Sequence, residues 1–319
     1  MATADQIKGL VRAYVDRNDE KFKTVVLQIA AHEAKIGHDN FARELKLQMD
    51  RLGSKRAGIV QLAPQNPMLL LSNPHCSLSE LIVSDDISER IQCILNEYRN
   101  RNKLYSYGLV NRRKILLEGE PGTGKTLTAS IIASELSLPL FTVQMDKLVT
   151  KFMGETSIKL RQIFDSIQSI TGVYLFDEFD AIGADRSMDN EVGEMRRILS
   201  SFLQFIEQDC SESIIIAATN NQKLLDQALF RRFDDVLHYS LPTIDEIQHL
   251  FEYKLVNFDK HFSITKELIQ VANGLNHAEI IKVCDDAIKT SILDEHPLSA
   301  KTVSSLLRER KNIYSYKEA

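Results

Sequence analysis

The segment GEPGTGKT, from Gly119 to Thr126, restricts the possible folds of this 319-residue chain more than any other feature. Its three glycines and one proline are incompatible with a regular helix. The spacing Gly-x4-Gly-Lys-Thr is that of a phosphate-binding loop, which joins a buried strand to the start of a helix. The apolar stretch ILLE precedes the segment and the helical stretch TLTASIIASEL follows it. The sequence therefore predicts a strand, a phosphate-binding loop and a helix in succession.

The loop chemistry indicates a nucleoside triphosphate with Mg²⁺ as cofactors. Backbone N–H groups from Gly122 to Thr126, together with the helix N-terminus, are expected to point at the phosphates. Lys125 is expected to neutralise the β and γ oxygens, and Thr126 to ligate the metal. The predicted nucleotide contacts in this segment are Glu120, Pro121, Gly122, Thr123, Gly124, Lys125, Thr126 and Leu127.

A second part of the same site is predicted at VYLFDEFD, where an apolar strand ends in Asp177 and Glu178. Two adjacent carboxylates repel each other when both are buried without partners, so a cation and a water are natural occupants. We expect Asp177 to hold the Mg²⁺ shell and Glu178 to act as the catalytic group that polarises the attacking water.

Short apolar runs alternate with amphipathic helical stretches after residue 77. The runs lack polar alternation, as expected for strands of a parallel sheet buried on both faces. Alternation of strands and helices predicts an α/β core in which helices cover both faces of the sheet, an αβα sandwich in three layers. The expected strands are Lys114–Leu117, Leu140–Val143, Val173–Phe176, Ile214–Ala217 and Val236–Tyr239.

The two ends of the chain read as helical. Residues 1–52 show helical periodicity with breaks at 17–19 and 37–40, which predicts a small N-terminal domain of three short helices. Residues 53–76 contain three prolines and two glycines and read as a linker around an apolar anchor at Met68–Leu71. The α/β ATPase core is assigned to 77–242 and a C-terminal helical lid to 243–319, with helices expected over 243–256, 264–273, 277–291 and 298–309.

Bulk properties point to a cytoplasmic protein that does not contact a membrane. No apolar run approaches the roughly 20 residues that span a bilayer, and the N-terminus lacks a secretory signal. The four cysteines are scattered, as expected for reduced thiols. A net charge of −5 argues against a wholly basic nucleic-acid-binding surface.

Further motifs occur in order along the chain: KFMGET at 151–156, DAIGADR at 180–186, AATNN at 217–221, LDQALFRRFDD at 225–235 and GLNHAEI at 274–280. Together with the two nucleotide motifs they resemble the AAA family of P-loop NTPases, within the AAA+ superfamily, over about residues 77–290. The resemblance is to the branch that remodels proteins. It implies ATP hydrolysis in a ring, typically a homohexamer.

The resemblance assigns catalytic roles to three more residues. Asn220 matches the family's first sensor, which orients the attacking water near the γ-phosphate. Arg231 and Arg232 resemble the arginine fingers that reach into the neighbouring subunit's site. The family usually separates the two arginines by a Pro-Gly insert, whereas they are adjacent here. We favour Arg231 as the dominant finger because of its position after the LDQALF helix.

KFMGE resembles the family's central pore loop, in which an aromatic-aliphatic pair grips an extended polypeptide. Here the pair is Phe152 and Met153, between Lys151 and Gly154. An exposed pair of this kind is costly unless it binds something. The alternative is that Phe152 packs into the core.

GLNHAEI occupies the place of the family's second sensor, with Asn276 and His277 replacing a small pair. His277 either approaches the adenine or ribose of the nucleotide or caps the helix that follows. No arginine occupies this position, which fits the remodelling branch better than the clamp loaders.

The leading functional hypothesis is a ring-forming ATPase that couples ATP hydrolysis to remodelling, unfolding or translocation of a protein. The N-terminal domain would select the substrate or adaptor. One alternative is a nucleotide-controlled switch that assembles with an effector such as a protease or nuclease. Another is a DNA-associated ATPase, which the basic residues Arg51, Lys55 and Arg56 favour weakly.

Overall fold

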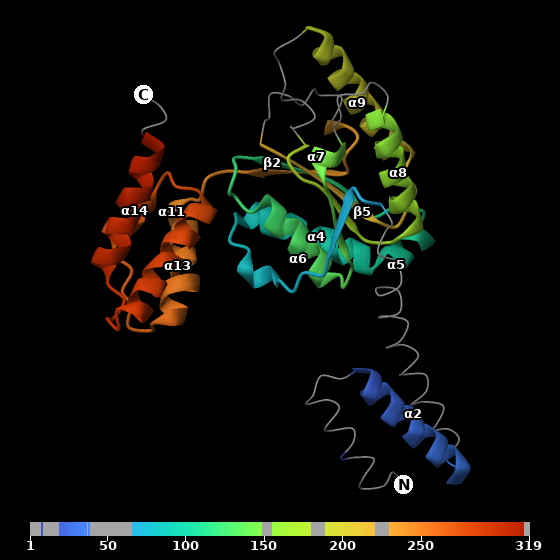
Figure 1. Ribbon diagram of the computed structural model, residues 1–319, viewed down its shortest axis with the longest axis horizontal. Helices are drawn as coiled ribbons and strands as arrows, with labels where there is room; N and C mark the ends of the chain where they lie inside the picture. The colour runs from blue at the N-terminus through green and yellow to red at the C-terminus, as the bar shows by residue number, and fades with distance from the viewer. Residues whose placement is uncertain are drawn as a thin grey trace. The chain divides into compact units, whose positions relative to one another are not determined.

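The computed structural model describes residues 8, 19–36, 38, 66–148, 155–179, 189–220 and 230–315 (Figure 1). The chain divides into two compact units, Met1–Gln65 and Asn66–Ala319. In the first unit, helix α2 (Asp19–Ile36) begins and ends at the two predicted breaks. Val26, Ile29 and Ala30 on this helix are buried. The other two helices predicted for the N-terminal region lie outside the described residues.

The second unit is built on a six-stranded sheet in the order β1-β3-β4-β5-β2-β6. All neighbouring strands are parallel except β1 and β3. The five predicted strands and the α/β fold class are confirmed, with β2 and β5 each two residues longer than expected. The strands are β1 (Leu69–Ser72), β2 (Lys114–Gly119), β3 (Leu140–Val143), β4 (Val173–Phe176), β5 (Ile214–Thr219) and β6 (Asp235–Tyr239).

Strand β1 falls in the range that the sequence indicated as linker. It pairs antiparallel with β3 at the edge of the sheet. Leu69 is buried, whereas Leu70 is 57% exposed, so the strand packs only one side against the core. The sheet therefore begins before residue 77, and the predicted domain boundaries stay a prediction.

Helices cover both faces of the sheet, which confirms the three-layer arrangement (Figure 1). On one face, α8 (Glu155–Ser169) and α9 (Asp189–Gln208) pack against alternate strand residues through an aromatic cluster that includes Phe176 and Phe202. On the other face lie α4 (Asp85–Arg99) and α6 (Lys125–Glu135). Alternate residues of each buried strand thus enter two separate cores, because successive side chains point to opposite faces.

The segment after β6 forms the predicted helical lid, with its own core around Phe251, Leu255 and Val283. Thr243 caps its first helix, since the Thr243 side chain accepts a hydrogen bond from Glu246 N. The lid elements are α11 (Ile244–Phe251), the π-helix η4 (Glu252–Val256), α12 (Lys266–Ala272), α13 (His277–Leu293) and α14 (Ala300–Ser315). Smaller elements of the unit are η1 (Leu78–Glu80), α5 (Arg101–Ser106) and α7 (Met145–Leu148). No helix in the described part of the chain is long and apolar enough to cross a bilayer.

Candidate functional site

The predicted site residues gather where the parallel strands end. The phosphate-binding loop joins β2 to α6, and β2 lies between β5 and β6. Asp177 and Glu178 directly follow β4, and Asn220 directly follows β5. In open α/β sheets, ligands bind outside the carboxyl ends of the strands. The topology therefore brings these three side chains to the same edge as the loop.

The phosphate-binding loop is held open by glycines in left-handed conformations and by its own hydrogen bonds. Gly122 and Gly124 have φ angles of +75° and +106°, values that other residues adopt only at a cost. The Lys125 ammonium donates to the carbonyl oxygens of Gly119 at 2.9 Å and Glu120 at 2.7 Å. Thr123 Oγ1 also donates to Glu120 O at 2.8 Å. These hydrogen bonds fix the backbone conformation of the loop.

The two carboxylates that follow β4, Asp177 and Glu178, differ in their contacts. Thr126 Oγ1 donates to Asp177 Oδ2 at 2.7 Å, which joins the start of α6 to the end of β4. The second oxygen of Asp177 accepts from Glu178 N at 2.9 Å. A hydroxyl and a carboxylate this close are the oxygen ligands that Mg²⁺ prefers, so the donor set fits the predicted metal. Glu178 is exposed and has a φ of +50°, an uncommon conformation for a residue other than glycine.

These residues line a cavity of about 350 Å³, a size within the usual range for small-molecule sites. Its polar wall consists of the loop from Pro121 to Leu127 with Asp177, Glu178 and Asn220. Its other wall is mainly apolar and comes from the end of η1, the two residues after it, and the lid: Glu80, Leu81, Ile82, Leu250, His277, Ala278 and Ile281. The cavity therefore offers a polar end for phosphates and an apolar end for a flat base.

The lid contacts the phosphate-binding loop at the start of α13. Ala278 N donates to Gly122 O at 3.0 Å. A Cβ added to Gly122 would lie 2.8 Å from the side-chain amide of Asn276. Asn276 also caps α13, because its Oδ1 accepts from Glu279 N at 2.9 Å. From the sequence, His277 was one candidate for the N-cap of α13. The N-cap is Asn276.

His277 is the first residue of α13 and lines the cavity with a side chain that is 7% exposed. Neither ring nitrogen has a hydrogen-bond partner among the described residues. Burial lowers the pKa of His277, and the nearby carboxylate of Glu246 opposes this shift. A neutral imidazole here has one donor and one acceptor available. Its predicted approach to the adenine or ribose stays a prediction.

The arginine pair lies at the opposite end of the parallel strands from the cavity, at the edge of the sheet where these strands begin. Arg231 and Arg232 belong to the turn directly before β6, and β6 runs parallel to β2. Because a strand rises about 3.3 Å per residue, β2 separates the two edges by roughly 17 Å. Arg231 is exposed, and Arg232 Nε lies 3.5 Å from Glu207 Oε2 on α9.

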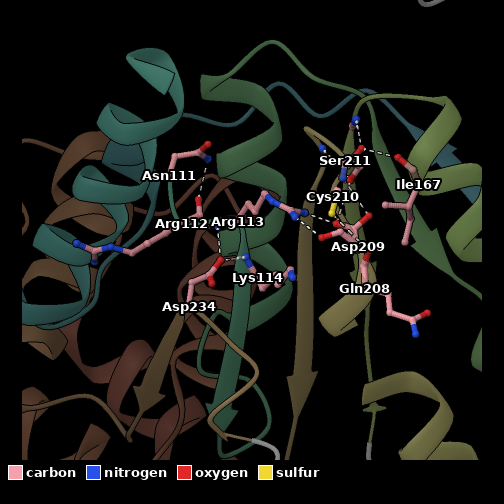
Figure 2. Close-up of polar contacts among 12 residues, drawn as sticks. Asn111, Arg112, Arg113, Lys114, Ile167, Gln208, Asp209, Cys210, Ser211 and Asp234 are labelled. Atoms are coloured by element: carbon pink, nitrogen blue, oxygen red, sulfur yellow. Dashed lines mark hydrogen bonds and ion pairs between the residues drawn. The ribbon is translucent and has the colours of Figure 1, made fainter. Parts of the chain in front are cut away.

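We call residues 231–234, between Phe230 and β6, the arginine turn. A polar network fixes the arginine turn to the start of β2 (Figure 2). Asp234 Oδ2 accepts the backbone N–H groups of Arg113 and Lys114, each at 2.9 Å. The Arg113 guanidinium forms a buried ion pair with Asp209, which follows the end of α9. Asp235 binds the guanidinium groups of Arg90 and Arg112. Sequence reasoning missed this network, although the two acids of RFDD and the basic run RRK were visible signals.

The remaining predicted site residues are not described. Lys151, Phe152, Met153 and Gly154 of the predicted pore loop lie outside the described residues, as does the DAIGADR motif. The structure therefore brings together the loop, Asp177, Glu178, Asn220 and His277, and separates them from Arg231 and Arg232.

The chain is similar to known proteins over most of its length. The family model described as "ATPase family associated with various cellular activities (AAA)" matches residues 115–241. An uncharacterised AAA family ATPase, y4kL, from Sinorhizobium fredii is 33% identical over 306 residues, which cover 92% of this chain and 91% of that relative.

Two further relatives match a smaller share of their own length. A putative 26S proteasome regulatory subunit homolog from Methanothermobacter marburgensis is 27% identical, over 73% of this chain and 64% of the relative. The ATP-dependent zinc metalloprotease FtsH of Parabacteroides distasonis is 31% identical, over 63% of this chain and 31% of the relative. The chain thus spans less than two thirds of each of these two proteins.

The contact between loop and lid predicts a site-specific effect of Gly122→Ala. The new Cβ would meet the Asn276 side chain at 2.8 Å, so the Asn276 side chain that caps α13 must shift and the contact between lid and loop is disturbed. We expect at least a tenfold weaker binding of a fluorescent ATP analogue, measured by titration. Gly274→Ala is the matched control, because Gly274 also has a positive φ, +89°, but has open space around it. Equal losses in both variants would contradict a role for the contact.

The buried His277 predicts a specific pH dependence of stability. The unfolded chain protonates this imidazole at its ordinary pKa near 6.5, whereas the folded state resists protonation. The unfolded state then binds more protons, so stability falls as the pH is lowered through this range, by up to about 1.4 kcal/mol per pH unit. Urea unfolding between pH 7.5 and 5 should show a steeper loss in the wild type than in His277→Leu. Parallel curves would contradict the prediction.

Proposed function

Because this chain belongs to the AAA family of ATPases, we propose that it hydrolyses Mg-ATP in a ring of identical subunits and uses the energy to remodel a protein. The observation that carries the proposal is the division of the predicted catalytic groups between two edges of one sheet. A second copy is needed to bring them together.

Within one subunit, we propose that the loop and the strand ends bind and activate the nucleotide. Lys125 would exchange its bonds to two loop carbonyls for the β and γ phosphate oxygens. Thr126 and Asp177, already in contact at 2.7 Å, would hold Mg²⁺. The bound metal would neutralise charge that develops on the phosphates.

Hydrolysis requires a water activated opposite the leaving phosphate. The exposed Glu178 is the proposed general base, and Asn220 is the proposed orienting group, since both line the cavity next to the metal ligands. The apolar wall of the cavity would take the adenine, with the neutral ring of His277 as a polar contact at its edge.

The arginine pair supports a site completed by a neighbour. The roughly 17 Å between the edges exceeds the reach of an arginine side chain, and the Asp234 network ties the turn to the start of β2. We propose that Arg231, with Arg232 second, enters the site of the next subunit and stabilises the charge of the transition state. Repetition of such a head-to-tail contact closes into a ring, for which six copies are proposed.

A protein substrate is supported by two relatives that are named for a proteasome regulatory subunit and a metalloprotease. We propose that Phe152 and Met153 contact the polypeptide and that residues 1–52 select it or bind an adaptor. A cytoplasmic location is part of the same proposal.

A mixing experiment tests whether the site is shared. Glu178→Gln should bind ATP but hydrolyse it at least about 10²-fold more slowly, because water activation is lost. The double variant Arg231→Ala/Arg232→Ala should lose at least about 10³-fold in kcat. A one-to-one mixture should regain activity, because about one interface in four pairs an intact site with intact arginines.

The control mixture combines Glu178→Gln with Lys125→Ala, in which every site is defective. This mixture should stay inactive in the same phosphate-release assay. If the first mixture forms mixed rings and also stays inactive, the arginines do not act across the interface.

The pore-loop assignment predicts a separation of two activities. Phe152→Ala should leave basal ATP hydrolysis within about twofold of the wild type, because Phe152 is assigned to the pore loop and not to the predicted nucleotide contacts. The same variant should lose unfolding of a tagged fluorescent protein, measured as loss of fluorescence. Unchanged unfolding, or a wild type that unfolds nothing while still assembling with an effector, would favour the nucleotide-controlled switch.

A further inference from the structure

A buried tyrosine lies against the phosphate-binding loop. Tyr239 is the last residue of β6 and is 4% exposed. Its ring oxygen lies 2.6 Å from the hydroxyl oxygen of Thr128, a fully buried residue of α6. Neither residue lines the nucleotide cavity. Buried hydroxyl groups need hydrogen-bond partners, and here each of the two serves the other.

The backbone of Tyr239 packs against the first residue of the loop. Tyr239 is the register partner of Gly119 in the parallel pairing of β6 with β2. A Cβ added to Gly119 would lie 2.8 Å from the Tyr239 Cβ and closer still to its carbonyl oxygen. Gly119 also has a φ of +144°, which favours glycine. The chain therefore leaves β2 and enters the loop in direct contact with Tyr239.

The side chain of Tyr239 reaches the other end of the loop through Thr128. Thr128 Oγ1 donates to Gly124 O at 3.1 Å. A threonine hydroxyl carries a single hydrogen, so in the contact with Tyr239 the phenol O–H is the donor. Burial raises the pKa of Tyr239, which keeps the phenol protonated at neutral pH. We call the chain of hydrogen bonds from Tyr239 through Thr128 to Gly124 the hydroxyl relay.

The carbonyl at the end of the hydroxyl relay belongs to the peptide group that precedes Lys125. Gly124 O also accepts the backbone N–H of Thr128 at 2.9 Å. In a planar trans peptide, C=O and N–H point in opposite directions. Two hydrogen bonds that hold Gly124 O toward α6 therefore aim the Lys125 N–H away from the helix, as binding of an anion at a helix N-terminus requires. Gly124 has no side chain that could restrict this peptide.

We propose that Tyr239 is a positioning residue for the nucleotide and that the hydroxyl relay sets the direction of the Lys125 N–H. This role rests on the proposed binding of ATP phosphates by the loop. Backbone donors bind a phosphate best when they already point at it, because no reorganisation is then needed. Without the Tyr239 hydroxyl, the Thr128 hydroxyl loses the donor that holds it in place, and the peptide before Lys125 gains freedom to rotate.

Titration of the full chain with a fluorescent ATP analogue tests this role. Tyr239→Phe removes only the hydroxyl and should bind the analogue about five- to tenfold more weakly, as expected for one lost hydrogen bond. Thr128→Val breaks the whole relay and should lose at least as much. The double variant should bind no more weakly than Thr128→Val, because both changes break one chain of hydrogen bonds. Thr128→Ser keeps the hydroxyl and should bind at least about threefold more tightly than Thr128→Val.

Tyr174→Phe is the matched control, because it also removes a buried phenol hydroxyl from a strand of the same sheet. Tyr174 on β4 is fully buried, and its O–H donates to Ser166 O at 3.0 Å and Ile170 O at 2.9 Å. These acceptors lie at the end of α8 and directly after it, outside the loop. Tyr174→Phe should lower the midpoint of urea unfolding and leave binding of the analogue unchanged.

The positioning role would be overturned if Tyr239→Phe bound the analogue as tightly as the wild type, or if Tyr174→Phe lost as much affinity as Tyr239→Phe. Either result would leave the proposed ATP site intact. Additive losses in the double variant would overturn the relay, as would equal affinities of Thr128→Val and Thr128→Ser, even if Tyr239→Phe did not fold. A wild type that does not bind the analogue would overturn the ATP site and the positioning role together.

Discussion

Strand β2 is the constraint on which the rest of the structure depends. It is hydrogen-bonded to β5 on one side and β6 on the other, and its central residues are fully buried. One end of this rigid strand carries the phosphate-binding loop, and at the other end the backbone N–H groups of Arg113 and Lys114 donate to Asp234. A parallel neighbour such as β6 must start at the edge where β2 starts. The arginine turn is therefore kept away from the cavity of its own chain.

This geometry gives the proposed ring a physical reason. No rearrangement that preserves the sheet moves the arginines to the other edge, and in the proposed ring another copy would supply them. The hydrogen bond between Ala278 and Gly122 connects the lid directly to the loop that would contact the phosphates. A change of the bound nucleotide would then tilt the lid, and a lid that contacts the neighbour would pass this movement on. In the proposed ring, this hydrogen bond would link phosphate chemistry to movement of the lid.

The sequence predicted the parallel core well because strands buried on both faces are continuous apolar runs. It missed β1, because the apolar run Met68–Leu71 lies in a proline-rich range and was interpreted as an anchor within a linker. The loop, Asp177 and Glu178 were recognisable because each directly follows a strand. The network of Asp209, Arg113 and Asp234 was not, because Arg113 lies 96 and 121 residues from the two acids in the sequence and only the folded sheet brings them together. The helix cap fell on Asn276, one residue before the histidine that drew attention.

The dependence of ATPase activity on protein concentration tests the shared site most directly. Phosphate release per chain would be measured over a thousandfold dilution, with ATP saturating throughout. The account predicts that activity per chain falls steeply below the concentration at which rings dissociate, while binding of a fluorescent ATP analogue persists. Constant activity per chain down to concentrations where only single copies remain would contradict it.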